Sequence, residues 1–282
     1  MTAESVLAGN GSDDCLTILY RAFLDPGDRI ACPWPTYGLY DTLAALQGAE
    51  LFRLPFRQVG RRYELPPELG AQGAKMIILA NPNNPSATLI PVATLRALCD
   101  EVAGRALVVV DEAYVDFALG AGLDASVLPA LGAHPNLCVL RTFSKGYSLA
   151  GARLGLLFAA PPIVEQLMKV KDSYNVNAIT QAVGTAALGD DAHHAACVRR
   201  TLDERRRLEQ GLAKLGLEWP EAAANFLLVE IGSRAGEIYE TLKRQGLLIR
   251  WWQTPELVTK VRISVGKPEE NDRLLAALAA AI

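Results

Sequence analysis

The sequence predicts an α/β protein in which helices cover a mainly parallel central sheet and a smaller α+β unit follows. Short β-rich runs alternate with helical patterns along the first two thirds of the chain, an order typical of parallel sheets. Several runs are almost entirely apolar, such as 76–79 and 107–110, as expected for strands with both faces buried. Near residue 187 a long, charged helical pattern begins.

The elements of the larger unit, predicted over residues 1–186, follow in chain order. Apolar residues at helical spacing predict helices at 14–24 and 91–103. Aliphatic and β-branched runs predict strands at 29–32, 50–54, 75–79, 106–110, 137–141 and 154–159.

The smaller unit is predicted over residues 187–282. A charged helix at about 190–215 connects it to the larger unit. The same patterns then predict strands at 225–231, 247–251 and 260–265, and helices at 235–245 and 268–281.

Composition excludes several classes of protein. The chain has 282 residues, of which 50% are hydrophobic and 21% charged, enough for a sizeable core and unlike a disordered chain. The net charge is −3, and the densest basic run, 205–207, lies among acidic residues, so we expect a solvated helix face and no nucleic-acid partner.

The cysteines and the apolar stretches indicate in which cellular compartment the protein is expected. The five cysteines form no Cys-x-x-Cys pair, which suits a reduced cytoplasmic protein. We expect no signal peptide and no membrane association, because no basic start precedes an apolar run and no apolar stretch is long enough to span a bilayer. The three histidines show no metal-ligand spacing, so no metal is expected.

A lysine, Lys145, follows the strand predicted at 137–141, within the segment TFSKG. Open α/β sheets bind ligands beyond the carboxyl ends of their strands, and a neutral lysine amine there can bond to a carbonyl carbon. Thr142 and Ser144, with Arg153 before the next strand, are able to hold a phosphate. A polar loop with a solvated lysine and a surface arginine is the alternative.

A carboxylate, Asp111, ends the apolar run 107–110. A buried carboxylate is costly unless a cation or strong donor meets it, and a protonated pyridine nitrogen is such a partner. An aspartate that keeps a pyridine protonated makes the ring an electron sink. Tyr114 is placed to donate to a phenolate oxygen of such a ring. Taken alone, the motif is better explained by a capping aspartate and a packing tyrosine.

Two further polar residues are candidates for contacts with a ligand. Asn84 lies in the loop NPNNPS, whose two Asn-Pro steps force an extended or turn backbone, and its amide can serve a cofactor oxygen and a substrate carboxylate. Arg262 lies in the alternating strand VRISV, and a planar guanidinium suits bidentate capture of a carboxylate. The alternatives are a simple turn and a solvent-facing arginine.

The segment GNGSDD precedes the helix predicted at 14–24. Ser12 is the predicted N-cap, and the backbone of Ser12 and Asp13 is a candidate anion site, because free N–H groups point outward at a helix start. A plain cap explains the segment equally well, and its two acidic residues weigh mildly against an anion. Tyr37, in an aromatic loop after the strand 29–32, is either a stacking partner for a flat ring or a packing aromatic.

These motifs occur together and in the order GNGSD, NPNNP, VVDEAY, TFSK with LAGAR, YNVN and RISVG. With this set, essentially the whole chain resembles the fold-type I pyridoxal-phosphate aminotransferases, and among them the histidinol-phosphate aminotransferase family. The narrower resemblance depends on GNGSD and on YNVN at 174–177. It implies pyridoxal 5'-phosphate as cofactor, a small-molecule amino donor and keto acceptor, and a homodimer with its active site at the subunit interface.

The resemblance also implies a role for each candidate residue. Lys145 bonds to the cofactor and shuttles a proton, and Asp111 pairs with the pyridine nitrogen. Tyr114 and Asn84 contact the ring hydroxyl oxygen, and Asn84 also contacts the substrate. The other implied roles are ring stacking by Tyr37, substrate-carboxylate binding by Arg262, and phosphate binding by the backbone of Ser12 and Asp13 with Thr142, Ser144 and Arg153.

Three departures from the family pattern affect what the resemblance implies. Ala87 stands where the family has glycine and tolerates positive φ poorly, so an altered turn is expected. Asp14 replaces the usual glutamate. Family chains begin several dozen residues before the GNGSD motif, and this chain begins eight residues before Gly9, so weaker phosphate binding and a more open site are expected.

The motifs leave other functions open. An aromatic amino-acid aminotransferase and a threonine-phosphate decarboxylase-like enzyme are alternative enzymes with the same cofactor, and a truncated, inactive homologue is the non-catalytic alternative.

Overall fold

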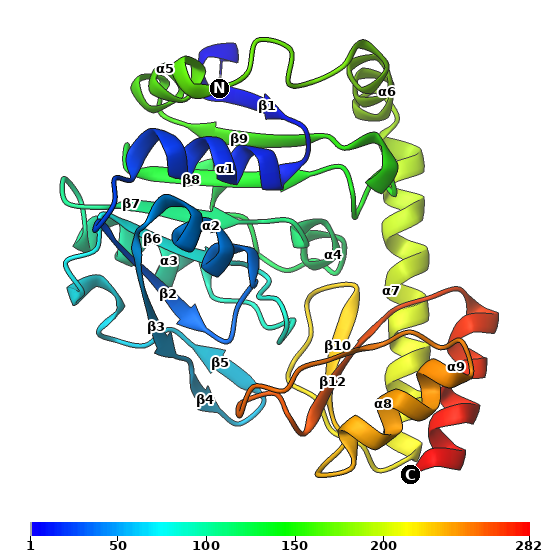
Figure 1. Ribbon diagram of the computed structural model, residues 1–282. Helices are drawn as coiled ribbons and strands as arrows, with labels where there is room; N and C mark the ends of the chain where they lie inside the picture. Colours follow the sequence, from blue (N-terminus) through cyan, green and yellow to red (C-terminus); the bar gives the residue numbers. More distant parts are fainter. Residues whose placement is uncertain (1) are drawn as a thin grey trace.

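The computed structural model describes residues 2–282, and its largest sheet has seven strands in the order β1-β9-β8-β7-β6-β2-β3 (Figure 1). The five strands from β8 to β3 run parallel to one another, whereas β9 is antiparallel to both of its neighbours. The predicted α/β fold with a mainly parallel sheet is confirmed.

Six strands of this sheet lie where apolar runs predict them, with ends that differ by no more than two residues. The sequence pattern does not predict β1, because this strand has only four residues and ends in glycine. The strands are β1 (Val6–Gly9), β2 (Arg29–Trp34), β3 (Glu50–Pro55), β6 (Met76–Ala80), β7 (Leu107–Asp111), β8 (Leu137–Thr142) and β9 (Gly155–Ala159).

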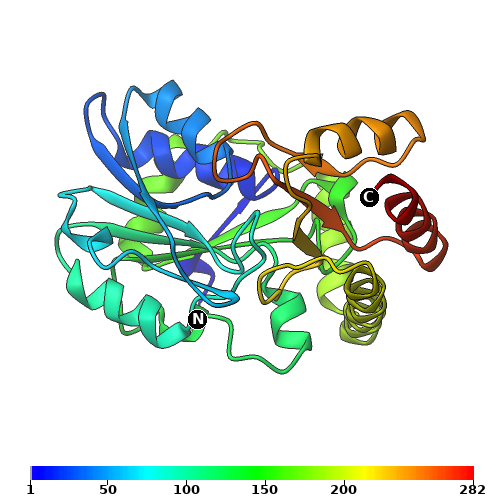
Figure 2. The ribbon, with the colours of Figure 1, turned by 90° about the horizontal axis from the view of Figure 1, so that it is seen from below.

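Helices cover both faces of the sheet (Figure 2). One face carries α1 (Ser12–Phe23), α2 (Leu39–Gln47) and α5 (Pro161–Val170), and the other carries α3 (Val92–Glu101). The side chains of β6 alternate between the two cores, with Met76 and Ile78 on the first face and Ile77 and Leu79 on the second. This alternation explains why β6 is apolar throughout.

The smaller unit follows α4 (Val115–Gly120) and α6 (Ala178–Leu188), and begins with the 24-residue helix α7 (Asp191–Lys214), which runs along the edge of the molecule (Figure 1). Its antiparallel sheet has the order β10-β12-β11 and its own apolar core. Within residues 2–282, no helix combines the length and apolar content needed to cross a membrane. The remaining elements are β10 (Phe226–Glu230), α8 (Ala235–Arg244), β11 (Arg250–Trp251), β12 (Lys260–Ser264) and α9 (Pro268–Ala281).

An exposed hairpin of β4 (Arg57–Val59) and β5 (Arg62–Glu64) connects the two units. Arg62 forms an ion pair with Glu221 at 2.6 Å, and the backbone N–H of Glu221 donates to the carbonyl oxygen of Arg61 at 2.8 Å. The sequence does not predict this hairpin, because its strands are short, polar and carry little apolar alternation.

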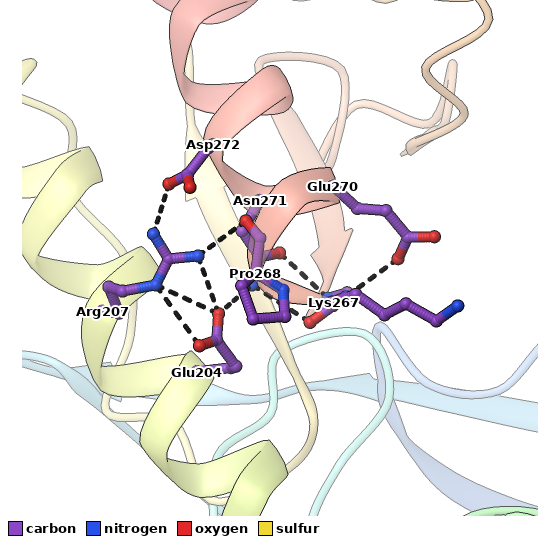
Figure 3. A network of polar contacts seen from close by, with 8 residues as sticks. Glu204, Arg207, Lys267, Pro268, Glu270, Asn271 and Asp272 are labelled. Carbon is purple, nitrogen blue, oxygen red and sulfur yellow. Dashed lines mark hydrogen bonds and ion pairs between the residues drawn. The ribbon is translucent and has the colours of Figure 1, made fainter.

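A polar network fixes the segment after β12 against α7 (Figure 3). Arg207 of α7 donates to Glu204, to Asp272 and to the carbonyl oxygen of Pro268. The buried Asn271 donates to Glu204 Oε2 at 2.9 Å, and its Oδ1 atom accepts from the backbone N–H of Gly266, after β12, at 2.9 Å. At the other end of α7, the ring of His194 stacks on Tyr147 with centroids 4.1 Å apart.

Candidate active site

The carboxyl ends of β2, β6, β7 and β8 contribute to one cavity of about 310 Å³, a size suited to a small-molecule ligand. Because parallel strands end at the same edge of a sheet, segments far apart in the chain meet there. The cavity is lined by every residue that the sequence analysis proposes for binding or catalysis: Ser12, Asp13, Tyr37, Asn84, Asp111, Tyr114, Thr142, Ser144, Lys145, Arg153 and Arg262. The roles of these residues remain predictions.

A larger cavity of about 470 Å³ lies between the β4–β5 hairpin and Trp219. Three of its charged side chains are already engaged within the protein: Lys260 pairs with Glu230 at 3.3 Å, and Arg61 donates to the carbonyl oxygen of Trp219 at 3.0 Å. We therefore place the candidate active site at the smaller cavity, where burial shifts the pKa values of Asp111, Lys145 and Arg262.

Asp111, the last residue of β7, is only 4% exposed. Its Oδ1 atom accepts a hydrogen bond from the backbone N–H of Ala113 at 3.1 Å, and its Oδ2 atom accepts one from the Tyr40 hydroxyl at 3.1 Å. Burial raises the pKa of Asp111 to about 6, although these hydrogen bonds oppose the rise. Each oxygen keeps a lone pair for a further donor, such as a protonated nitrogen of a ligand.

Tyr40 is a residue of the site that the sequence analysis missed. It lies fully buried on α2, and its ring packs edge-on against Tyr37 with centroids 5.6 Å apart. Tyr37 lines the cavity and donates to Asp13 Oδ1 at 3.4 Å. The hydroxyl of a buried tyrosine usually finds a hydrogen-bond partner, but the sequence does not reveal which partner it is.

Lys145 lies half-buried in the loop between β8 and β9, with its amine 5.4 Å from the centroid of the Tyr114 ring. Burial lowers the pKa of the Lys145 amine, and the charge of Arg262 lowers it further, whereas Asp13 and Asp111 act in the opposite direction. A lowered pKa increases the fraction of neutral amine, which is the nucleophilic form. The environment of Lys145 therefore favours covalent chemistry.

Arg153 forms a cationic, donor-rich part of the cavity. Its guanidinium donates to Ser144 Oγ at 3.4 Å and lies 3.8 Å from the carboxylate of Asp13. Thr142 Oγ1 accepts from the N–H of Ser144 at 3.1 Å, and the first turn of α1 supplies the N–H groups of Ser12 and Asp13. A phosphate fits these donors.

The prediction that Ser12 caps the first helix is wrong. Gly11 is the N-cap, with a φ of +92°, and Ser12 is the first residue of α1. A Cβ atom on Gly11 would lie 2.6 Å from the guanidinium of Arg153, and one on Gly155 would lie 2.2 Å from the backbone nitrogen of Ser12. The two glycines thus allow the helix start to approach Arg153 and β9 closely.

Arg262 reaches the cavity from β12 of the smaller unit. Its Nη1 atom donates to Asn84 Oδ1 at 2.7 Å, and its guanidinium lies 5.0 Å from the centroid of the Phe226 ring. Its Nε atom is buried and has no hydrogen-bond partner within residues 2–282. A carboxylate or phosphate can engage the donors that remain.

The turn after Asn84 contains an alanine in the left-handed region of backbone conformation. Ala87 has a φ of +63° and is fully buried against Ala224 and Phe226. Its carbonyl oxygen accepts from the N–H of Ala223 at 2.7 Å. These contacts hold the alanine in a conformation that normally favours glycine.

The YNVN segment supports the start of α1. Asn175 donates to the carbonyl oxygen of Ala8 at 3.0 Å and to Asp14 Oδ2 at 3.2 Å, so it holds the turn before the helix. Asn177 is the N-cap of α6, and the ring of Tyr174 is 94% exposed.

The donor set of the cavity fits pyridoxal 5'-phosphate. That molecule carries a basic ring nitrogen, an aldehyde and a phosphate, and the cavity offers a buried carboxylate at Asp111, an amine of lowered pKa at Lys145 and the donors around Arg153. In the part of the chain that the structure describes, no group of three or more His, Cys, Asp or Glu residues is arranged to hold a metal ion.

Comparison with known proteins agrees with this geometry. Residues 1–278 match the family described as aminotransferase class I and II. The chain is 42% identical over 276 residues to histidinol-phosphate aminotransferase 1 of Nostoc sp.. This match covers 97% of this chain and 75% of that protein. It is 40% identical over 278 residues to histidinol-phosphate aminotransferase 1 of Trichormus variabilis, with 98% and 77% of the two chains covered.

A solved structure has a similar fold over almost the whole of this chain. The crystal structure of histidinol-phosphate aminotransferase from Sinorhizobium meliloti in complex with pyridoxal-5'-phosphate superposes with a TM-score of 0.90 at 28% sequence identity. The match covers 99% of this chain and 77% of that chain. By fold, site and sequence, the chain belongs to the class I and II aminotransferase family.

Proposed function

We propose that this chain is a pyridoxal-phosphate-dependent aminotransferase that moves an amino group between histidinol phosphate and the glutamate/2-oxoglutarate pair. The observation that carries the proposal is the buried carboxylate of Asp111 in the same cavity as the half-buried amine of Lys145. The names of the relatives from Nostoc and Trichormus support the substrate, and the Sinorhizobium complex supports the cofactor.

Each residue of the cavity has a separate role in the proposed reaction. When bound, pyridoxal 5'-phosphate supplies an electron sink that acidifies the C–H bond next to a substrate amine. Asp111 would accept a hydrogen bond from the protonated ring nitrogen, and Asn84 and Tyr114 would donate to the ring oxygen. Lys145 would hold the cofactor through its amine and, once the substrate amine has displaced it, would move the proton at the amine-bearing carbon.

The substrate end of the cavity favours anions. Arg262 can bind the carboxylate of glutamate in one half-reaction and the phosphate of histidinol phosphate in the other. A second guanidinium lies nearby: the ring of Trp252 is 5.8 Å from the guanidinium of Arg262 and 5.5 Å from that of Arg250. Two cations suit a phosphate-bearing substrate better than an uncharged aromatic side chain.

A half-reaction tests this proposal. The cofactor-loaded chain mixed with L-glutamate in single turnover should change its visible absorbance and release 2-oxoglutarate, and histidinol phosphate should replace glutamate as donor. The absence of any change with all amine donors would contradict the proposal. Release of CO₂ from threonine phosphate would indicate a decarboxylase, and preference for phenylalanine or tyrosine would indicate an aromatic aminotransferase.

Arg262→Ala should lower kcat/KM for glutamate by about 100-fold, because a bidentate, charge-assisted contact is lost. Retention of the cofactor should change little. Arg262→Lys keeps the charge but lacks the planar guanidinium, so its kcat/KM for glutamate should lie between those of the wild type and Arg262→Ala. Steady-state kinetics with cofactor quantified per chain would check this, and equal losses of cofactor and of activity would contradict the role of Arg262.

We infer that the chain forms a homodimer through the face around β1, α5 and α6. Large apolar side chains are exposed there, with Tyr174 94%, Ile179 78% and Met168 52% exposed. A groove of about 530 Å³ lies at the same face. Exposed apolar patches of this kind mark interfaces, and twofold dimers are the commonest closed assembly.

Light scattering should therefore give twice the mass of one chain. Ile179→Lys should shift the protein toward the monomer, because it places a charge within this face. Leu248→Lys is the control, since Leu248 is 80% exposed on the smaller unit. A monomeric wild type, or equal behaviour of both variants, would count against the proposed face.

We also propose a cytoplasmic location. All five cysteines are free thiols in the structure, and four of them are buried. Thiols kept reduced fit a cytoplasmic enzyme better than an exported one.

A further inference from the structure

We propose that Tyr40 is a positioning residue of the active site, whose buried hydroxyl holds the Asp111 carboxylate in one orientation as the acceptor for a protonated ring nitrogen. The inference rests on the proposed function, because it presupposes a nitrogen-containing ring bound at Asp111.

The geometry fixes both oxygens of the carboxylate. Tyr40 is 0% exposed, and its hydroxyl is 3.1 Å from Asp111 Oδ2. The backbone N–H of Ala113 lies 3.1 Å from Oδ1. The two donors come from α2 and from the segment after β7, so the carboxylate cannot rotate without losing a buried hydrogen bond, which is costly.

Tyr40 also contacts the wall of the cavity. Its ring meets Tyr37 edge-on, with an interplanar angle of 84°. Tyr37 lines the cavity, whereas Tyr40 lies behind it and does not. One buried side chain therefore supports both the carboxylate and the aromatic ring beside it.

The charge around Asp111 shows why this hydroxyl matters. Burial raises the pKa of Asp111, and Asp13 and Glu112 raise it further, whereas the hydrogen bonds from Ala113 and Tyr40 lower it. Glu112 is itself paired with Arg141 at 2.7 Å. The other titratable groups whose pKa values respond to Asp111 are Lys145, Cys15, Tyr37, Tyr40 and Tyr114.

The Tyr40 hydroxyl keeps its proton near neutral pH and can donate it to the Asp111 carboxylate. Burial raises the pKa of this phenol well above its usual value, so it stays protonated. Without it, Asp111 loses one of its two donors and holds a proton up to a higher pH. That proton competes with the proton on a bound ring nitrogen.

Tyr40→Phe tests the proposal through the dissociation constant of pyridoxal 5'-phosphate, measured by fluorescence quenching between pH 6 and 8.5. Loss of one hydrogen bond corresponds to about one pKa unit at Asp111. Binding should therefore weaken about fivefold at pH 6 and by less than about twofold at pH 8.5.

Tyr20→Phe is the matched control. Tyr20 is 1% exposed, and its hydroxyl has no hydrogen-bond partner within residues 2–282. Its removal should leave the pH dependence of cofactor binding unchanged. A loss of affinity in Tyr40→Phe that is the same at pH 6 and 8.5 would reduce Tyr40 to a packing residue and overturn the proposal.

A second measurement does not need the cofactor. In the cofactor-free chain, ionisation of Asp111 lowers the melting temperature as pH rises, and Tyr40→Phe should move this decline to higher pH. An unmoved decline would also overturn the proposal. If the wild type binds no pyridoxal 5'-phosphate at any pH, the proposed function fails, whereas the melting profile still reports on the Tyr40–Asp111 contact.

Discussion

Lys145→Ala is expected to lower kcat for transamination by about 10⁴-fold or more, because it removes both the covalent attachment and the group that moves the proton. The visible absorbance of the cofactor-loaded chain should revert to that of free pyridoxal 5'-phosphate. The fold should persist, since burial already disfavours the charged amine of Lys145 and its removal leaves no unpaired charge. Absorbance spectra, single-turnover kinetics and circular dichroism would check these results.

Two variants complete this experiment. Lys145→Arg keeps a cation in the cavity but offers no nucleophilic amine, so it should be as inactive as the alanine variant. Lys243→Ala removes an exposed amine from α8 and should behave like the wild type. An unchanged absorbance band in Lys145→Ala would mean that another lysine holds the cofactor.

Asp111→Asn should weaken cofactor binding and at the same time stabilise the cofactor-free chain at alkaline pH. The pKa of Asp111 is raised to about 6 in the folded chain, so folding favours the protonated carboxyl. The Asp111 carboxyl makes its full contribution to the free energy of unfolding below about pH 4. This contribution declines as pH rises through about 6, and by pH 8 the free energy of unfolding has fallen by about 3 kcal/mol. Asparagine has the same shape without the charge and avoids this loss.

Urea denaturation of the cofactor-free variant and wild type at pH 4.5 and pH 8 would measure the effect. The asparagine variant should be more stable by about 1 to 3 kcal/mol at pH 8, and this difference should be smaller by about 2 kcal/mol at pH 4.5. A variant less stable at pH 8, or a difference independent of pH, would show that the Asp111 carboxylate does not destabilise the empty site.

The sequence predicts the sheet well because its strands are buried on both faces. Runs such as 76–79 and 107–110 have apolar side chains in both cores, so they are recognisable without knowledge of their neighbours. The β4–β5 hairpin has no such pattern, and its contacts with Glu221 come from a segment more than 150 residues away. The antiparallel direction of β9 likewise depends on pairing, which a local pattern does not encode.

The candidate site could be predicted wherever a residue type has a distinctive chemistry at the end of a strand. Lys145 and Asp111 follow recognisable strands, and the structure brings both to one cavity. Tyr40 could not be identified, because its partner lies 71 positions away and a buried tyrosine on a helix has many possible partners. The error at Ser12 has a local cause, since the sequence shows a capping residue but not the φ of +92° that Gly11 adopts.

The attachments at the two ends of α7 link movements within the molecule. Arg207 and Asn271 bind the stretch beyond β12 to this helix, and at its other end the ring of His194 stacks on Tyr147, two residues beyond Lys145. The helix α7 thus connects the segment that follows β12, the strand of Arg262, to the loop that carries Lys145. A displacement of α7 would therefore be transmitted through the His194–Tyr147 stack to the loop that carries Lys145, so the positions of Arg262 and of the lysine amine are mechanically linked.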